Sequence, residues 1–276
     1  MDGKICLITG ANSGIGKATA IGLAELNATI VMLCRDKARG ELAQKEIIEL
    51  TGNKNVDLLL CDLSSQEDIR KFVSEFKNKY QSLHVLINNA GIMKKQGTLS
   101  TDGFEMNFAV NHLAPFLLTN LLLEMLKKSA PSRIINVSSA AHRMAKLDFD
   151  DLQSENKKLR LMRIYGISKL ALMLFSYELS RKLEGTKVTV NTVHPGMVAT
   201  NLGRDMSKSN QGFGKRFFKT PREGAETSVY LASSPEVEGI TGKYYTKKRQ
   251  KNSSKKSYNE EDAKKIWEIS VEMTKL

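Results

Sequence analysis

Residues 9–20 read TGANSGIGKATA and come directly after an apolar run, Ile5–Thr9. The glycines Gly10, Gly14 and Gly16 permit a tight turn after a strand and let a ligand approach the backbone closely. The helix expected next would present free N–H groups and the positive end of its dipole to that ligand. The stretch therefore predicts a strand, a turn and a helix with a pyrophosphate-binding site at the turn. A glycine-rich turn without a ligand is the alternative.

The rest of the chain continues this alternation almost to its end. Apolar, strand-like runs are separated by amphipathic helical segments such as 65–80, where Ser65 and Asp68 make a capping pair. The runs are apolar throughout rather than alternating, as burial on both faces requires. The expected strands are Ile5–Thr9, Ala28–Leu33, Val56–Leu60, Leu83–Ile87, Arg133–Val137, Lys187–Thr192 and Gly239–Tyr245.

Alternation of this kind predicts βαβ units with right-handed crossovers. We therefore expect an α/β fold, a single Rossmann-type doubly wound parallel sheet of about seven strands with helices on both faces. No linker or break in composition precedes about residue 246, so residues 1–276 are expected to form one domain. The polar stretch 252–262 is expected to loop out before a last helix around Trp267.

Composition narrows the class of protein. Of the 276 residues, 41% are hydrophobic, which is ample for a large core. Cys6, Cys34 and Cys61 fit no metal-ligand or disulfide spacing and are interpreted as small core residues in a reducing compartment. Residues 1–9 do not resemble a signal peptide, and the most apolar long stretch, 113–126, is too short to cross a membrane. We therefore expect a soluble, cytoplasmic protein.

The chain is basic, with 42 basic and 30 acidic residues and a net charge of +12. Residues 204–219 and 243–256 contribute heavily to the excess. A solvated basic surface is the favoured interpretation, and peripheral contact with an anionic membrane surface stays open. Nucleic acid is not expected as a partner, because no helix-turn-helix, zinc-finger or RNA-binding motif accompanies the charge.

The end of the second strand indicates which dinucleotide is bound. An acid about 20 residues beyond the glycines would bind both ribose hydroxyls of NAD. This chain has Cys34 there, followed by Arg35, whose guanidinium suits a 2′-phosphate. NADP(H) is therefore favoured over NAD(H). The alternative is that Arg35 is a surface charge and that Asp36 contacts the ribose.

Two further strand ends fit a nucleotide site. Asp62 follows the third strand, at the edge where an adenine would lie, although it could equally cap the next helix. Residues 88–91, Asn-Asn-Ala-Gly, end the fourth strand, where they leave room for a ribose and supply amides that can brace the sheet. Alone, this tetrapeptide would be only a turn signal.

The fifth strand ends in Ser138 and Ser139, and ligands of open α/β sheets bind beyond the carboxyl ends of the strands. Asn111 begins an apolar helical run that could lie on the same side, and Tyr165 and Lys169 open a later helix one turn apart. A phenol has a pKa of about 10 and is a poor base near neutrality. We expect the ammonium of Lys169 to lower the pKa of Tyr165, so that the phenol can act as acid or base on an alcohol–carbonyl pair.

Each of these side chains also has a purely structural interpretation when it is taken alone. Tyr165 could be a half-buried tyrosine, Lys169 a surface lysine, Ser139 a strand-end polar group and Asn111 the first residue of a helix. Co-occurrence in order (glycine turn, NNAG, Asn, Ser, Tyr-x-x-x-Lys) favours the chemical interpretation. The histidines show no spacing typical of a metal site or a triad, so no metal is expected and they are interpreted as structural: His112, His142 and His194.

With these motifs in order, the sequence resembles the short-chain dehydrogenase/reductase family. The matching residues are TGANSGIG (9–16), NNAG (88–91), Asn111, Ser139, Tyr165-Gly-Ile-Ser-Lys169 and Pro195-Gly196. The resemblance implies that Tyr165 is the catalytic acid/base and that Lys169 assists it. It also implies that Ser139, rather than Ser138, orients the substrate and that Asn111 helps hold a proton-relaying water. The cofactor-binding residues that it implies are Gly10, Asn12, Ser13, Gly14, Ile15, Gly16, Arg35, Asp62, Leu63, Asn89, Ala90, Gly91, Tyr165, Lys169, Pro195, Gly196, Val198 and Thr200.

A closer resemblance is to the retinol-dehydrogenase-like branch of this family. The segments that carry it are NVSSAAH (136–142), SKLALMLFSYELSRKL (168–183) and VHPGMVATNL (193–202). It implies an NADP(H)-dependent oxidoreductase that transfers a hydride between the nicotinamide and a small hydrophobic aldehyde, ketone or alcohol. The alternative, a non-catalytic dinucleotide-binding redox sensor or scaffold, is disfavoured because both Tyr165 and Lys169 are present. A homo-oligomer stays open, because the expected helices at 101–126 and 165–184 could pair subunits.

Overall fold

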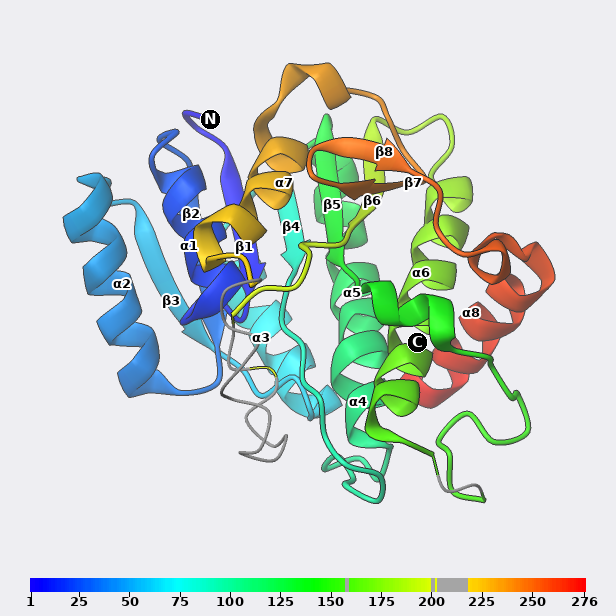
Figure 1. The fold of residues 1–276 in the computed structure, drawn as a ribbon. Coiled ribbons are helices and arrows are strands. Elements are labelled where there is room, and N and C mark those ends of the chain that lie inside the picture. Colours follow the sequence, from blue (N-terminus) through cyan, green and yellow to red (C-terminus); the bar gives the residue numbers. More distant parts are fainter. Residues whose placement is uncertain (157–158, 200–201, 203–217) are drawn as a thin grey trace.

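The computed structural model describes residues 1–156, 159–199, 202 and 218–276. Within these residues one sheet has the strand order β3-β2-β1-β4-β5-β6-β7-β8 (Figure 1). Its strands are β1 Ile5–Thr9, β2 Thr29–Cys34, β3 Val56–Leu60, β4 Val85–Asn88, β5 Ser132–Val137, β6 Val188–Val193, β7 Lys243–Thr246 and β8 Arg249–Lys251. Strands β1 to β7 pair in parallel and β8 pairs antiparallel to β7. The predicted α/β fold with a mostly parallel sheet is confirmed. The predicted bounds of β1 and β3 match the observed ones, and those of the other predicted strands differ by up to four residues at an end.

Strand β8 was not expected from the sequence. It forms a hairpin with β7 in which Thr246 pairs with Arg249, so the turn consists of Lys247 and Lys248 alone. Both lysines have positive φ, 51° and 59°, as a type I′ turn requires. Asn-Gly or Asp-Gly usually announces such a turn, and Lys-Lys gives no such signal. The sheet therefore has one strand more than the predicted seven.

Helices cover both faces of the sheet. On one face lie α1 Gly14–Ala24, α2 Lys37–Thr51 and α7 Pro221–Ser233, and on the other lie α3 Gln66–Lys79, α5 Ala114–Lys128 and α6 Leu161–Lys182. Successive residues of β1 serve the two layers: Leu7 packs with the α3 side and Ile8 with the α1 side. Burial on both faces explains why the strands are apolar at every position. The predicted capping pair is confirmed, because the Ser65 side chain accepts a hydrogen bond from the backbone of Asp68 at the start of α3.

The helical segment Met106–Lys128 is longer than the apolar stretch that the sequence suggested. It consists of α4 Met106–Phe108, a π-helical turn η1 Ala109–Leu113, and α5. By length and composition this segment could span a membrane, but 72% of its most apolar window is buried inside the fold. The core of an α/β protein accounts for such a segment.

The C-terminal stretch does not loop out as predicted. Ser253 and Ser257 are buried, and a 3₁₀ helix, η7 Lys255–Tyr258, leads into α8 Glu260–Thr274. Trp267 of α8 packs against Phe116 and Phe175, with ring centroids 5.1 and 5.9 Å apart. Helix α8 therefore covers the groove between α5 and α6.

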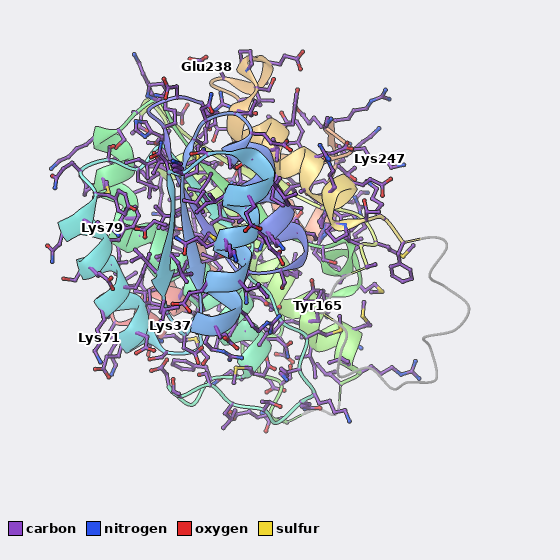
Figure 2. The ribbon with its side chains drawn as sticks, turned by 90° about the vertical axis from the view of Figure 1, so that its left-hand side faces the viewer. Lys37, Lys71, Lys79, Tyr165, Glu238 and Lys247 are labelled. Atoms are coloured by element: carbon purple, nitrogen blue, oxygen red, sulfur yellow. The ribbon has the colours of Figure 1, made fainter. Side chains whose placement is uncertain are left out.

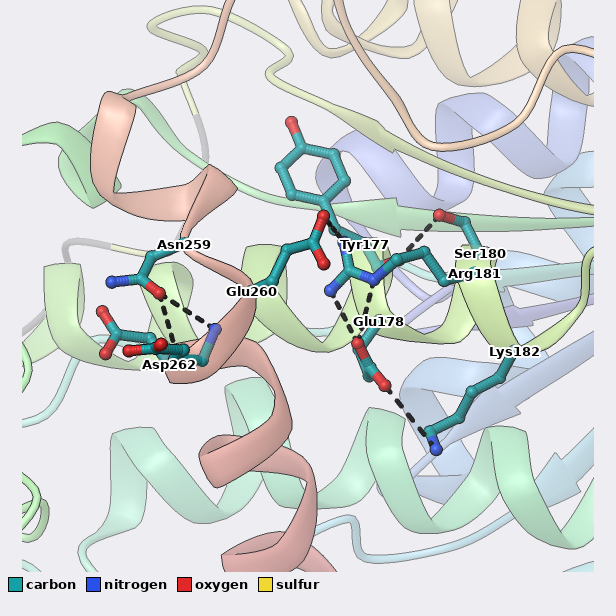
Figure 3. A network of polar contacts seen from close by, with 9 residues as sticks. Tyr177, Glu178, Ser180, Arg181, Lys182, Asn259, Glu260 and Asp262 are labelled. Carbon is teal, nitrogen blue, oxygen red and sulfur yellow. Dashed lines mark hydrogen bonds and ion pairs between the residues drawn. The ribbon is translucent and has the colours of Figure 1, made fainter.

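Polar contacts fasten the start of α8 to α6 (Figure 3). Glu178 of α6 is 93% buried by its side chain and is held by Arg181 at 2.6 Å and Lys182 at 3.6 Å. Arg181 also faces Glu260 at 4.0 Å, and Asn259 accepts two backbone N–H groups as the N-cap of α8. A nearly buried carboxylate with two cationic partners keeps its charge compensated.

Candidate active site

The glycine turn brings the backbone close to its neighbours and leaves the start of α1 without a side-chain cap. Gly10 and Gly14 have positive φ, 67° and 56°, and a Cβ at Gly16 would overlap the Gly10 carbonyl oxygen and the Asn89 side chain. Ser13 is the N-cap of α1, yet its side chain makes no capping hydrogen bond, and the first turn carries no acid. The first backbone N–H groups of α1 therefore have no side-chain cap from Ser13.

The NNAG segment braces the glycine turn from the neighbouring strand. The Thr9 hydroxyl accepts the backbone N–H groups of Asn89 and Ala90 at 2.9 and 2.8 Å. The Asn89 amide donates in return to the Thr9 carbonyl at 2.8 Å. Asn88 reaches the other way, donating to Asn136 at 2.7 Å and Thr119 at 3.0 Å. The bracing expected of these amides is confirmed.

The end of β2 lies against the glycine turn. The Cys34 thiol accepts the backbone N–H groups of Ala11 and Asn12, and burial raises its pKa to about 11, so the thiol stays neutral. Asp36 is engaged as the N-cap of α2, accepting the Arg39 N–H at 3.0 Å. The alternative in which Asp36 contacts a ribose therefore competes with a helix cap.

Arg35 and Asp62 lie together at this edge of the sheet. Arg35 Nη1 is 3.8 Å from Asp62 Oδ2, and the guanidinium side chain is 75% exposed. Asp62 does not cap α3; its Oδ1 accepts the backbone N–H and the hydroxyl of Ser64 at 2.9 and 2.8 Å. The next residue, Leu63, packs against the core. Arg39, whose charge also acts on the Cys34 thiol, adds a second guanidinium that the sequence interpretation missed.

Ser139, Tyr165 and Lys169 meet at the carboxyl end of β5. Helix α6 begins at Leu161, so Tyr165 lies in its second turn rather than at its start. Tyr165 and Lys169 are 95% and 97% buried, and the Tyr165 hydroxyl is hydrogen-bonded to the Ser139 side chain. Ser138 instead donates to the Lys169 carbonyl at 3.5 Å. The geometry thus distinguishes the two serines. Figure 2 labels Tyr165 near the middle of the molecule, and Lys71, Lys79 and Lys247 toward its edges.

The charge state of this group differs from the expectation. Burial raises the pKa of Tyr165 to about 12, although the hydrogen bond to Ser139 acts in the opposite direction. Burial also lowers the pKa of Lys169 to about 7. The predicted lowering of the phenol pKa by Lys169 is wrong for the chain's own groups, because the desolvation that disfavours phenolate also weakens the ammonium that would stabilise it.

Asn111 lies within the π-helical turn rather than at a helix start. Its Oδ1 accepts the Ile92 N–H at 2.8 Å, and its Nδ2 donates to the Ile92 carbonyl at 2.9 Å and to Ser168 at 3.0 Å. These bonds hold the backbone of Ile92, directly after Gly91. A Cβ added at Gly91 would lie 3.5 Å from Lys169 Nζ. A π-turn places one residue out of helical register, which suits a site residue.

The Pro195-Gly196 turn closes the site from the side of β6. Gly196 has a φ of 96°, and Val198 forms a β-bridge with Lys219. A Cβ at Gly224 of α7 would lie 2.7 Å from Val198 and 3.3 Å from Ile15, so this glycine lets the turn approach the end of α1. Neither Gly224 nor Lys219 belongs to a motif that the sequence analysis recognised. Thr200 and residues 204–217 of the first basic segment lie outside the described residues.

An apolar cluster surrounds the Tyr165 ring. Met93 and Ala141 are buried against it, and Leu161 and Leu202 pack on the cluster. Met93 immediately follows Ile92, whose backbone Asn111 holds. Among the residues that the structure describes, no group of three or more His, Cys, Asp or Glu side chains could hold a metal ion.

Comparison with known proteins agrees with this arrangement. The short chain dehydrogenase family model matches residues 4–211. Human retinol dehydrogenase 14 is 47% identical, over all of this chain and 88% of the relative, and human retinol dehydrogenase 13 is 43% identical, over 99% and 85%. A crystal structure of an uncharacterised protein from Mycobacterium paratuberculosis superposes with a TM-score of 0.81 at 32% identity, over 99% of this chain and 94% of that one. The chain therefore belongs to the short-chain dehydrogenase/reductase family, in its retinol-dehydrogenase-like branch, and is an NAD(P)-dependent oxidoreductase.

Proposed function

We propose that this protein is an NADP(H)-dependent reductase or dehydrogenase of hydrophobic aldehydes, ketones and alcohols, with Tyr165 as its acid/base. The observation that carries the proposal is the buried group of Ser139, Tyr165 and Lys169 at the carboxyl end of β5, with apolar side chains around the phenol. The non-catalytic sensor is the rival, and a buried phenol hydrogen-bonded to a serine disfavours it.

The residues that would hold the dinucleotide fit it. The amides at the start of α1 would bind the pyrophosphate, Gly91 and Lys169 would lie at the nicotinamide ribose, and Pro195-Gly196 with Val198 would line the nicotinamide. The unfilled helix cap and the absence of side chains at Gly10 and Gly16 support this assignment. When bound, the nicotinamide supplies or accepts the hydride.

The chain's own groups handle the proton. With a pKa of about 12, Tyr165 is protonated at neutral pH and can donate to a developing alkoxide. Burial therefore disfavours the phenolate at pH 7, and the reverse reaction, in which Tyr165 acts as the base, needs added positive charge near the phenol. We expect the Ser139 hydroxyl to hold the same substrate oxygen.

Preference for NADP(H) rests on the end of β2. Cys34 is neutral and buried, so no carboxylate occupies the position that would bind the ribose hydroxyls of NAD. Arg35 is exposed beside it, and Arg39 lies in the first turn of α2. Guanidinium groups pair with a phosphate monoester by charge-assisted hydrogen bonds.

The apolar cluster around Tyr165 supports the proposed substrate class. Met93, Leu161 and Leu202 offer no hydrogen bond to a sugar or an acid, whereas they can pack on a hydrocarbon chain. The retinol dehydrogenases that this chain resembles support an apolar aldehyde or alcohol of that kind. The decisive experiment follows NADPH and NADH oxidation with a panel of aldehydes of increasing chain length, retinal included. Tight NADPH binding without turnover on the whole panel would favour the sensor.

The net positive charge of the protein raises the question of an anionic partner. Lys71 and Lys79 of α3 are labelled on one side of the molecule and Lys247 on the opposite side (Figure 2), which favours a solvated surface over a nucleic-acid groove. The hairpin turn Lys247-Lys248 and the exposed strand β8 concentrate charge at one end of the sheet. If the protein touches an anionic membrane, we propose that this hairpin makes the contact, and vesicle co-sedimentation that falls with salt would test it.

A further inference from the structure

His142 lies three residues after Ser139, in the 3₁₀ helix η2 Ala140–Met144, and its side chain is fully buried. Its Nδ1 is 2.6 Å from the Ser139 carbonyl oxygen, and its Nε2 is 3.1 Å from the Ser254 backbone nitrogen. A carbonyl can only accept and a backbone N–H can only donate. The two partners therefore fix the ring as neutral. Its proton is on Nδ1, which donates to the Ser139 carbonyl, and the lone pair of Nε2 accepts the Ser254 N–H.

The Nε2 partner belongs to the segment that was expected to loop out. Ser254 directly precedes η7, and other side chains hold the same segment against η2. Arg143 donates to the Asn252 carbonyl at 2.6 Å, and Lys256 donates to the Ala145 carbonyl at 2.8 Å. The C-terminal segment thus supports η2 from outside.

The inner side of η2 lies directly on the helix that carries Tyr165. A Cβ at Gly166 would lie 2.7 Å from the Ala141 carbonyl, so η2 and α6 touch backbone to backbone beside the phenol. Ser139 is the N-cap of η2, and its hydroxyl is bonded to the Tyr165 hydroxyl. Any rotation of η2 therefore changes where Ser139 stands relative to Tyr165.

We propose that His142 is a positioning residue for the reaction: by bridging the Ser139 carbonyl to the Ser254 N–H, it fixes the Ser139 hydroxyl at the Tyr165 phenol. The inference rests on the proposed function, because Ser139 must act on the substrate for its placement to matter. Misplacing a catalytic group by about an ångström can slow a reaction up to about a hundredfold.

Three variants separate positioning from general stability. His142→Ala removes both bonds, and His142→Asn keeps an N–H near Nδ1 for the Ser139 carbonyl. Tyr177→Phe is the matched control, because it removes a buried hydrogen bond of 2.8 Å to Ser253 in the same C-terminal segment without touching Ser139. We expect His142→Ala to lower kcat about tenfold or more, with the KM for the aldehyde and the Kd for NADPH within about threefold of wild type. His142→Asn should recover most of kcat, and Tyr177→Phe should keep it.

The opposite results would overturn the inference. If His142→Ala retains kcat within about twofold, or if Asn is no better than Ala, His142 only fills the core. Should the Ala variant fail to fold, His142→Gln replaces it, since Gln can accept from Ser254 but does not place a donor at Ser139. A kcat that is higher for Gln than for Asn would contradict the proposal.

If wild type turns over no aldehyde, the proposed function fails, and NMR of isotope-labelled Tyr165 tests the role of His142 separately. His142→Ala should then shift the Tyr165 ring signal and Tyr177→Phe should not; an unmoved signal would overturn the inference.

Discussion

Lys169 Nζ lies 5.8 Å from the centre of the Tyr165 ring and donates to the Val137 carbonyl at 2.9 Å. The ammonium is therefore seated beside the phenol but turned to the end of β5 rather than to bulk water. Among the described residues that carbonyl is the only hydrogen-bond partner of Lys169 Nζ, so Lys169 has donors to spare for a ligand. The predictions below on pH and on Gly91 depend on this position of Lys169.

The first concerns pH. Burial lowers the pKa of Lys169 from 10.5 to about 7. Between pH 7 and pH 10.5 the Lys169 side chain is therefore protonated in the unfolded chain and neutral in the folded protein. The free energy of unfolding should then rise as pH increases from 7 towards 10.5. Below pH 7 the full cost of burying the Lys169 amine should be present. Relative to Lys169→Met, wild type should gain roughly 3 kcal/mol between pH 7 and about 9.5. Urea unfolding of both proteins measures this, and parallel pH profiles would contradict it.

The second concerns cofactor choice. Arg35→Ala should weaken NADPH binding about tenfold or more while changing NADH binding little, because only NADPH offers a phosphate to the guanidinium. Lys37→Ala is the control, since Lys37 is exposed nearby and pairs with Glu41 at 3.8 Å. Fluorescence titration with both dinucleotides gives the ratio. Equal losses for the two would remove the case for 2′-phosphate recognition.

The third concerns Gly91. A Cβ there would meet Asn111 and Lys169 at 3.4 and 3.5 Å, which are ordinary contacts, so Gly91→Ala should fold with nearly unchanged thermal stability. If this glycine leaves room for the nicotinamide ribose, the added methyl should still weaken NADPH binding by about tenfold. Calorimetry measures the stability and the affinity separately. Unchanged affinity would place the ribose elsewhere.

The fourth concerns the glycine turn. Gly16→Ala should destabilise the protein by more than about 2 kcal/mol, because the new methyl would overlap the backbone of Gly10 and the brace at Asn89. Gly22→Ala is a milder comparison, since its methyl would meet only the Val229 side chain, at 2.8 Å. Denaturant unfolding compares them. Equal losses would mean that the turn relaxes freely.

Much of this architecture was readable from the sequence because it is local. Apolar runs, the glycines of 9–16 and the Ser65 cap each announce an element through neighbouring residues, and the chain order of Ser139, Tyr165 and Lys169 followed from motifs. The β7–β8 hairpin was missed because Lys247 and Lys248 adopt positive φ in its turn, where glycine or asparagine is usual. A Lys-Lys pair therefore does not announce the turn.

Other features could not be predicted because they depend on distant contacts. The pKa of Tyr165 is set by burial under several elements, and the spacing to Lys169 gave the wrong sign. His142 had no partner within its own sequence neighbourhood other than Ser139; its second bond comes from Ser254, 112 residues away. The π-turn at Asn111 likewise reflects packing rather than propensity.

The most direct test of the account is a comparison of wild type with Tyr165→Phe during NADPH oxidation by an apolar aldehyde, with NADPH affinity measured in parallel. We expect kcat to fall by about a thousandfold while the Kd for NADPH changes less than about threefold, because the hydroxyl gives its proton only to the reacting oxygen. Turnover that survives the loss of the hydroxyl would contradict the assignment of Tyr165 as the acid.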